Sequence, residues 1–185
     1  MLKKAILVVL VLVLFLFLVS CQPTTPPDKC SSLKDLQKDN CYSEQLKCSQ
    51  VKDLSVRDDC VVSIAKKKQS LEVCNLVVNN QSKGYCQEQI AELTKNVTIC
   101  SQISTSYWQD NCYFNLALNG TNSKTCSQIS NQPQKNNCFQ ELAVSVPDHS
   151  LCYFVSKNET QRCLAKVARK SLDPQICSVL DTNFN

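Results

Sequence analysis

Glycine and histidine are scarce in this chain, whose 185 residues include 2 Gly and 1 His. So little glycine argues against Rossmann and P-loop phosphate sites, because the turns of those sites need backbone without side chains. A single His excludes most His-based zinc sites and most Ser-His or Cys-His catalytic arrangements. No C-x-x-C motif occurs, and Cys41 and Cys48 are farther apart than the cysteine pairs of structural zinc sites. We therefore expect no enzymatic activity, no metal site and no cofactor.

The N-terminus has the features of an export signal. Lys3 and Lys4 precede an uninterrupted apolar run of 15 residues, Ala5–Val19. That run has the length of a signal-peptide core and is shorter than the roughly 20 residues of a membrane-spanning helix. It leads into Leu18-Val19-Ser20-Cys21, which resembles the lipobox of prokaryotic lipoproteins. The resemblance implies that residues 1–20 are removed and that Cys21 carries a lipid; an uncleaved anchor and an ordinary signal peptide cut nearby are the alternatives.

A proline-rich segment follows the expected lipid anchor. In residues 21–29, Cys21 is followed by QPTTPPDK, whose three prolines stiffen the chain and deny it helix hydrogen bonds. We interpret this segment as a tether that carries a repeat domain of residues 30–185. Removal of Lys3 and Lys4 lowers the formal charge from +4 to +2, which gives no reason to expect a nucleic-acid partner. Export also places the remaining cysteines where thiols are oxidised, so we expect disulfides.

The cysteines after the tether follow a regular spacing. They stand at positions 30, 41, 48, 60, 74, 86, 100, 112, 126, 138, 152, 163 and 177. From Cys48 onward, separations of 12 and 14 alternate, with a single 11 between Cys152 and Cys163. This spacing defines a repeat of 26 residues, each with a first and a second Cys, and such a period is typical of stacked arrays.

Other columns of the repeat indicate helices. The residue three positions after the first Cys is aliphatic in every unit: Leu33, Val51, Val77, Ile103, Ile129, Val155 and Leu180. From Cys60 onward, the residue four positions after the second Cys is aliphatic as well: Ile64, Ile90, Leu116, Leu142 and Val167. In the same units the next position holds alanine: Ala65, Ala91, Ala117, Ala143 and Ala168. Apolar positions at i, i+4 and i+5 favour a helical face, and the constant small residue predicts a close approach between helices.

Capping residues indicate where these helices begin. Four positions before the first Cys stand residues that cap helix N-termini: Ser70, Asn96, Asn122, Asp148 and Asp173. We expect a first helix of two to three turns to start there, and Pro174 suits a first helical position. Ser55 and Asn158 are the expected caps of the second helix. The predicted fold is all-α, a short α-solenoid of disulfide-stapled helical hairpins.

Helix rise predicts which cysteines pair. With caps at Asp148 and Asn158 and a rise of about 1.5 Å per residue, we can place both cysteines along their helices. Cys152 and Cys163 then lie on facing helices, each about 6 to 7 Å from the turn between them. The second Cys of one unit and the first Cys of the following unit are about 7 Å apart along the helix axes, which is too far for an unstrained disulfide. The expected pairs are Cys30–Cys41, Cys48–Cys60, Cys74–Cys86, Cys100–Cys112, Cys126–Cys138 and Cys152–Cys163.

This register leaves Cys177 over as a possible free thiol. The competing register joins each second Cys to the next first Cys, uses Cys177 and leaves Cys30 free. In either register each bridge closes a short loop, worth about 3 kcal/mol in the chain-entropy model. Helices this short are marginal alone, so we expect the bridges to replace part of a hydrophobic core.

Aromatic side chains gather around Cys112 and form a candidate interface: Tyr107, Trp108, Tyr113 and Phe114. The alternative is that these side chains fill the seams between hairpins. Four sites match the N-glycosylation acceptor pattern and leave glycosylation open: Asn80, Asn96, Asn119 and Asn158.

The chain from Cys21 onward resembles Cys-rich helical-repeat lipoproteins encoded by archaea and some bacteria. This resemblance rests on the lipobox, on the Cys-Ser-Gln-Ile sequence that recurs at 100–103 and 126–129, and on the Cys and Ala columns. It implies an extracytoplasmic protein, lipid-anchored to the cell membrane through Cys21, but no activity. We expect a non-enzymatic binding or scaffold module at the cell surface, with a protein or an envelope polymer as its partner. There are two alternatives. One is a thiol–disulfide redox protein that uses unpaired Cys177 or Cys30, and the other is a passive envelope spacer.

Overall fold

The computed structural model describes residues 28–172 and 175–176, in two units, Met1–Lys34 and Asp35–Asn185. In the first unit, Asp28 organises a turn: its side chain accepts the amide of Cys30 at 3.1 Å and its carbonyl accepts the amide of Ser31 at 2.9 Å. Several predictions made above lie outside the described residues, namely those for Cys21, Asp173, Pro174, Cys177 and Leu180.

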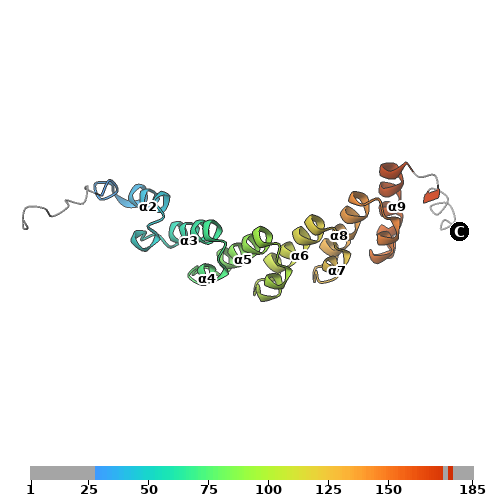
Figure 1. Ribbon diagram of the computed structural model, residues 1–185, viewed down its shortest axis with the longest axis horizontal. Coiled ribbons are helices and arrows are strands. Elements are labelled where there is room, and N and C mark those ends of the chain that lie inside the picture. The colour runs from blue at the N-terminus through green and yellow to red at the C-terminus, as the bar shows by residue number, and fades with distance from the viewer. Residues whose placement is uncertain (1–27, 173–174, 177–185) are drawn as a thin grey trace, which may run out of the picture. The chain divides into compact units, whose positions relative to one another are not determined.

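Every regular element described in the second unit is a helix (Figure 1). The longer helices are α2 (Asp35–Glu44), α3 (Leu54–Lys68), α5 (Asn80–Thr94), α6 (Ser106–Gly120), α8 (Gln132–Ser145) and α9 (Lys157–Ser171). The shorter ones, with 3₁₀ helices written η, are η1 (Cys48–Gln50), α4 (Leu71–Cys74), η2 (Val97–Gln102), α7 (Ser123–Cys126) and η3 (His149–Phe154). From η1 onward, each repeat is therefore a short helix with the first Cys followed by a long helix with the second.

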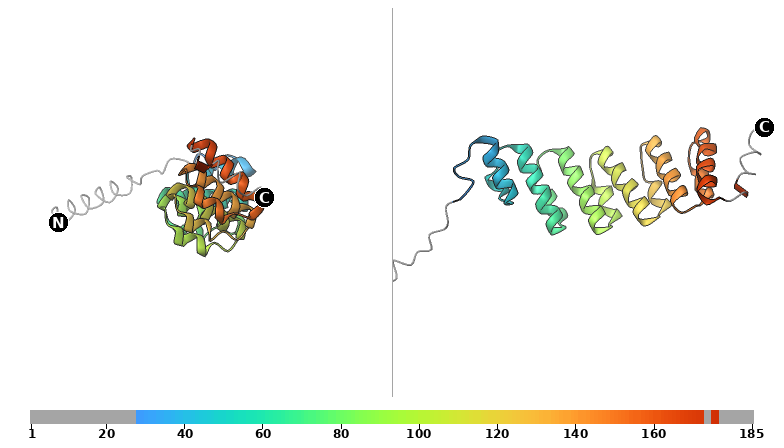
Figure 2. Two further views of the ribbon diagram at one scale, coloured as in Figure 1. Left: turned by 90° about the vertical axis from the view of Figure 1, so that its right-hand side faces the viewer. Right: turned by 90° about the horizontal axis from the view of Figure 1, so that it is seen from above.

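Each hairpin of the second unit packs against its neighbours in the sequence. Helix α5 contacts α3 on one side and α6 on the other, and η2 contacts both α5 and α6. Helix α8 is placed in the same way, with α6 and α9 as its neighbours. Figure 2 shows these hairpins following one another in a row. The prediction of an all-α solenoid of stapled hairpins is confirmed.

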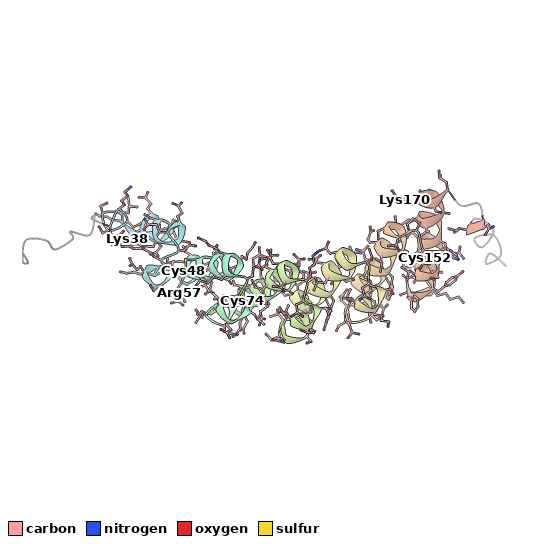
Figure 3. All side chains as sticks on the ribbon, viewed as in Figure 1. Lys38, Cys48, Arg57, Cys74, Cys152 and Lys170 are labelled. Atoms are coloured by element: carbon pink, nitrogen blue, oxygen red, sulfur yellow. A yellow bond between two sulfur atoms is a disulfide. The ribbon has the colours of Figure 1, made fainter. Side chains whose placement is uncertain are left out.

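Five disulfides join cysteines within single hairpins, as predicted, and Figure 3 labels one cysteine of three of them, Cys48, Cys74 and Cys152. The bonded pairs are Cys48–Cys60, Cys74–Cys86, Cys100–Cys112, Cys126–Cys138 and Cys152–Cys163. Their Cα atoms lie 5.5 to 5.6 Å apart. The competing register is therefore wrong for these residues. Cys30 and Cys41 are also disulfide-bonded, and their pairing with each other stays a prediction.

The first helix of each hairpin is shorter than predicted, with three to six residues. In η1, η2 and η3, the aliphatic residue three positions after the first Cys ends the helix. Ile103, for example, has extended backbone with φ −75° and ψ 120°, and its side chain is buried. These three helices stop two residues after the Cys, whereas α4 and α7 stop at the Cys itself.

The predicted caps of the first helices are correct in position. Asn96, Asn122 and Asp148 each accept a hydrogen bond from the amide two residues ahead, at 2.9 to 3.1 Å. Ser70 occupies the same cap position but makes no such bond with its side chain.

The predicted caps of the second helices are wrong by two residues. Asp53, not Ser55, caps α3, and its carboxylate accepts the amides of Ser55 and Val56 at 2.9 and 3.0 Å. Ser156, not Asn158, precedes α9. The error follows from the first helix: because that helix ends early, the turn is completed sooner and the second helix starts sooner.

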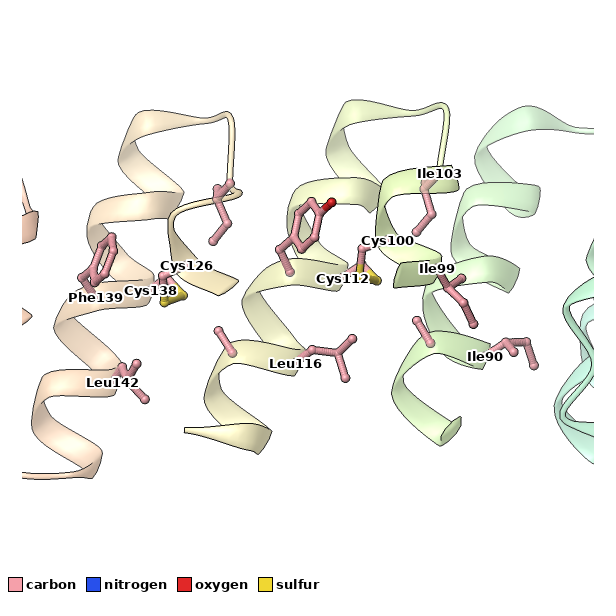
Figure 4. Close-up of a cluster of buried hydrophobic side chains, with 14 of the residues drawn as sticks. Ile90, Ile99, Cys100, Ile103, Cys112, Leu116, Cys126, Cys138, Phe139 and Leu142 are labelled. Carbon is pink, nitrogen blue, oxygen red and sulfur yellow. A yellow bond between two sulfur atoms is a disulfide. The ribbon is translucent and has the colours of Figure 1, made fainter. Parts of the chain in front are cut away.

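The aliphatic and alanine columns form the core between hairpins (Figure 4). Four of the five column alanines are fully buried, namely Ala65, Ala91, Ala117 and Ala143, and Ala168 is nearly so. Their carbonyls also shape the turn to the next hairpin. The carbonyl of Ala91, for instance, accepts the amide of the cap residue Asn96 at 3.0 Å. The column therefore predicts both close packing and a tight turn.

Non-glycine residues end several long helices in the left-handed region. Gln69, Lys95, Thr121 and Leu172 have φ between 50° and 55°. A side chain at this φ is unfavourable, most of all a β-branched one. We expect Thr121→Gly to raise the free energy of unfolding by about 1 kcal/mol. Asn119→Gly, two residues earlier in the helix, should lower it by a similar amount. Denaturant midpoints of the two variants check this, and equal shifts of the same sign would contradict it.

Candidate binding surface

In four of the described long helices, a side chain two positions before the second Cys holds the turn that leads to the next long helix. Two positions before the second Cys of α3, Asp58 is only 2% exposed, and its carboxylate accepts the amides of Val78 and Asn79 at 3.0 and 2.8 Å. In α6, Asp110 accepts the amides of Ser130 and Asn131 at 2.7 and 2.9 Å. The second residue of each amide pair is the N-cap of the next long helix. We call this arrangement the carboxylate clamp.

The clamp has two further versions. Asp39 accepts the amides of Lys52 and Asp53 at 3.1 and 2.8 Å, and these two bonds hold the pKa of its carboxyl below the ordinary value. Asn136 replaces the carboxylate in α8: its Oδ1 accepts the amide of Ser156 at 3.2 Å and its Nδ2 donates to the Ser156 hydroxyl at 2.7 Å. Sequence analysis missed this column, although the acidic residues two positions before the second Cys were its signal.

Gly84 takes the clamp position in α5, and an indole fills the space instead. A Cβ at Gly84 would overlap Thr105 Oγ1 and lie 2.8 Å from Trp108 Cδ1. The Trp108 ring packs against Tyr85 and Tyr107, with ring centroids 5.1 and 4.9 Å apart. The Thr105 hydroxyl is buried without a hydrogen-bond partner among the described residues.

Gly84→Ala is therefore expected to be destabilising by about 1 to 3 kcal/mol, the usual effect of overpacking. Helix propensity alone predicts the opposite, a gain of about 0.5 to 1 kcal/mol. Gly120→Ala in α6 is the matched control, because a Cβ there has nothing within 4 Å and should give that gain. Thermal or denaturant unfolding of both variants distinguishes the two effects. Stabilisation by Gly84→Ala would contradict the packing described here.

The four aromatic residues of the candidate interface lie in different surroundings. Tyr107 is 61% exposed, whereas Trp108 and Phe114 are half-buried against the core and Tyr113 is buried. Burial and the neighbouring Asp110 raise the pKa of the Tyr113 hydroxyl. Three of the four thus contribute to the seams between hairpins, and an interface role for Tyr107 stays a prediction.

An apolar groove follows α3 between η1 and α4. Its volume is about 590 Å³, and its lining residues are Leu46, Cys48, Ser49, Arg57, Val61, Ile64, Lys68, Val73 and Leu76. Five of them are aliphatic and two, Arg57 and Lys68, are cationic. We call it the α3 groove.

A second groove, between α8 and α9, is polar. It has a volume of about 500 Å³, and the side chains that line it satisfy one another. The buried Gln140 amide donates to Glu159 at 3.3 Å and accepts from Lys166 at 3.2 Å, while Arg162 pairs with Glu159 at 3.1 Å. The second cation of the groove, Lys166, also lies 3.9 Å from Glu141, so both cations that line the groove are paired.

Helix α5 also carries a buried carboxylate, Glu88. Asn115 and Gln89 donate to it at 2.9 and 3.0 Å, and Lys66 donates to the Gln89 side chain at 2.8 Å. Burial and the proximity of Glu88 raise the pKa of Glu92, one turn along the helix. These contacts connect α3, α5 and α6 and are satisfied internally.

The chain was compared with protein families, curated proteins and solved structures. No family model, curated protein or solved structure matches it. The candidate site therefore has to be interpreted from its own geometry.

Within the described ranges, no group of three or more His, Cys, Asp or Glu side chains is arranged to hold a metal ion. The helices in those ranges are also too short or too polar to span a bilayer. The disulfides indicate an oxidising, extracytoplasmic environment.

Proposed function

We propose that this protein is an extracytoplasmic lipoprotein, held at the membrane by a lipid on Cys21, that acts as a non-enzymatic binding module. The lipobox resemblance at Leu18-Val19-Ser20-Cys21 supports the anchor, and the proline-rich residues after it support a tether. The disulfides of the repeat domain support an extracytoplasmic location. The partner is a protein or an envelope polymer.

One observation carries the binding role: adjacent repeats are coupled while their surfaces differ. Disulfides fix each hairpin internally, and carboxylate clamps such as that of Asp58 fix the turn to the next one. The surfaces of the repeats nevertheless differ: an apolar groove with two cations follows α3, whereas the groove between α8 and α9 is polar and its charges are paired. A repeat scaffold with position-specific grooves is the usual basis of binding by solenoid proteins.

The anchor and the binding role are tested separately. For the anchor, membrane fractions of cells that express the wild type and Cys21→Ser are compared. The wild type should remain in the membrane fraction and release a lipid-modified N-terminal Cys21 peptide, detected by mass spectrometry. Release of Cys21→Ser into the soluble exported fraction supports the lipid. Retention of both forms indicates an uncleaved anchor and contradicts it.

For the binding role, intact cells are treated with a membrane-impermeant cross-linker and the protein is recovered. The native protein should repeatedly yield one specific partner that the reduced and alkylated protein does not bind. Turnover of a thiol or disulfide substrate that depends on Cys177 would favour the redox alternative. Recovery of no specific partner, together with no effect of deletion beyond a change of envelope spacing, would favour the passive spacer.

A further inference from the structure

The α3 groove has a regular pattern along its helix. Arg57, Val61, Ile64 and Lys68 occupy positions i, i+4, i+7 and i+11 of α3, and all four line the groove. They form one stripe on the helix surface, with a cation at each end. At about 1.5 Å per residue, the two cations lie about 16 Å apart along the axis. Figure 3 labels Arg57, together with Cys48, which also lines the groove.

The walls of the groove are apolar. Leu46 and Cys48 come from the η1 side, and Val73 and Leu76 come from the α4 side. Leu76 is 67% exposed, so its side chain is accessible to a ligand in the groove. The corresponding residue of three other repeats is glutamine, Gln50, Gln102 and Gln128, so the fold does not require an apolar side chain there.

Another repeat fills the same space with its own side chains. The counterparts of Val61 and Leu76 in the α8 repeat are Phe139 and Phe154, whose rings stack with centroids 5.2 Å apart. The smaller Val61 and Leu76 leave a groove of about 590 Å³ where the phenylalanines close the surface. The hollow is therefore a property of this repeat rather than of the architecture.

The charge of the groove is uncompensated. The side chains of Arg57 and Lys68 make no hydrogen bond or ion pair with any described residue. None of the nine lining residues is Asp or Glu. The polar groove between α8 and α9 differs, because there Glu159 pairs with Arg162. A ligand with an apolar face and a carboxylate toward each end would complement the α3 groove in shape and charge.

We propose that the α3 groove binds an acidic amphipathic helix of a partner protein. The partner helix lies along α3. Its apolar side chains, at positions i, i+3 or i+4, and i+7, pack among Val61, Ile64, Val73 and Leu76. Two of its carboxylates pair with Arg57 and Lys68. Helix-in-groove recognition uses this pattern of anchors. The proposal rests on the proposed function and adds the chemical class of the partner.

The test uses two synthetic helical peptides of about 18 residues and the mature, oxidised protein. One peptide carries two Glu spaced as Arg57 and Lys68 are, with Leu at i+4 and i+7 between them. The other carries Lys in place of both Glu. Fluorescence anisotropy should show that the Glu peptide binds about tenfold more tightly at low ionic strength, with the difference reduced at high salt.

Matched variants locate the site. Lys68→Glu and Leu76→Gln should each weaken binding of the Glu peptide about tenfold. Lys67→Glu makes the same change of charge at the adjacent exposed residue, which does not line the groove, and should have little effect. Circular dichroism and disulfide mapping confirm that all three variants fold as the wild type does.

Equal affinity for the two peptides, or equal effects of Lys67→Glu and Lys68→Glu, would overturn the proposal. Binding to anionic phospholipid vesicles that depends on Arg57 and Lys68, without binding of the Glu peptide, would also overturn it. The proposed function is distinguished by the surface cross-linking experiment. If Lys68→Glu retains the partner that the wild type captures, this inference fails while the binding role stands.

Discussion

Replacing Cys100 and Cys112 together by alanine is expected to lower the local free energy of unfolding of the η2–α6 hairpin by about 3 kcal/mol. The bond joins residues 12 apart in sequence and restricts the unfolded chain. Both sulfurs lie at the centre of the buried cluster, so the alanines also leave unfilled volume. The short helix has six residues and does not persist without the bond that fixes it to α6.

Hydrogen exchange read by mass spectrometry measures this effect hairpin by hairpin, which suits an array whose stability is a sum of units and interfaces. Amides of η2 and of the first turns of α6 should exchange faster by about two orders of magnitude, the rate equivalent of about 3 kcal/mol. The α9 hairpin, which keeps Cys152–Cys163, is the internal control. Unchanged protection of η2 in the double variant would show that packing alone maintains the hairpin.

The second large effect is expected from Asp58→Ala, which should lower the free energy of unfolding by about 3 kcal/mol. The substitution leaves the amides of Val78 and Asn79 without their acceptor at a buried turn. Most of this loss of stability comes from the two buried amides that are left without an acceptor, because alanine itself is favourable in a helix.

Two variants serve as controls for this substitution. Asp59→Ala removes the adjacent, exposed carboxylate of the same helix and should change stability by less than about 0.5 kcal/mol. Asp58→Asn keeps one acceptor oxygen, as Asn136 does in α8, and should have an intermediate effect. Denaturant unfolding compares the three. A loss from Asp59→Ala as large as that from Asp58→Ala would show that helix charge, and not the clamp, accounts for the effect.

The cysteine pairing was predictable because the regular spacing of the cysteines determines which of them face each other. Alternating separations of 12 and 14 place the two cysteines of a unit on facing segments, and this holds although the assumed helix bounds were wrong. Cys152 is the fourth residue of η3, as assumed, but Cys163 is the seventh residue of α9 and lies deeper in its helix than the assumed cap placed it. The lengths of the first helices were predicted wrongly. The aliphatic residue three positions after the first Cys, such as Val155, fits a helix by its spacing, and the sequence does not show that this residue lies beyond the helix end.

The clamp and the groove were not predictable for a different reason. A single buried aspartate such as Asp58 resembles any solvated helix carboxylate in sequence, because its partners are backbone amides 20 and 21 positions away that no side-chain pattern marks. The α3 groove likewise depends on what is missing from it, namely the bulk that Phe139 and Phe154 provide elsewhere. The aromatic cluster was visible, but its burial was not, because Trp108 is accommodated by the absent side chain of Gly84.

The most direct measurement of the central claim is the far-ultraviolet circular dichroism of the mature protein before and after complete reduction and thiol alkylation without denaturant. The account predicts loss of most of the helical signal and of the cooperative thermal transition, because short helices such as η2 and α4 depend on Cys100–Cys112 and Cys74–Cys86. Retention of the helical signal and of a cooperative melting transition in the fully alkylated protein would contradict it.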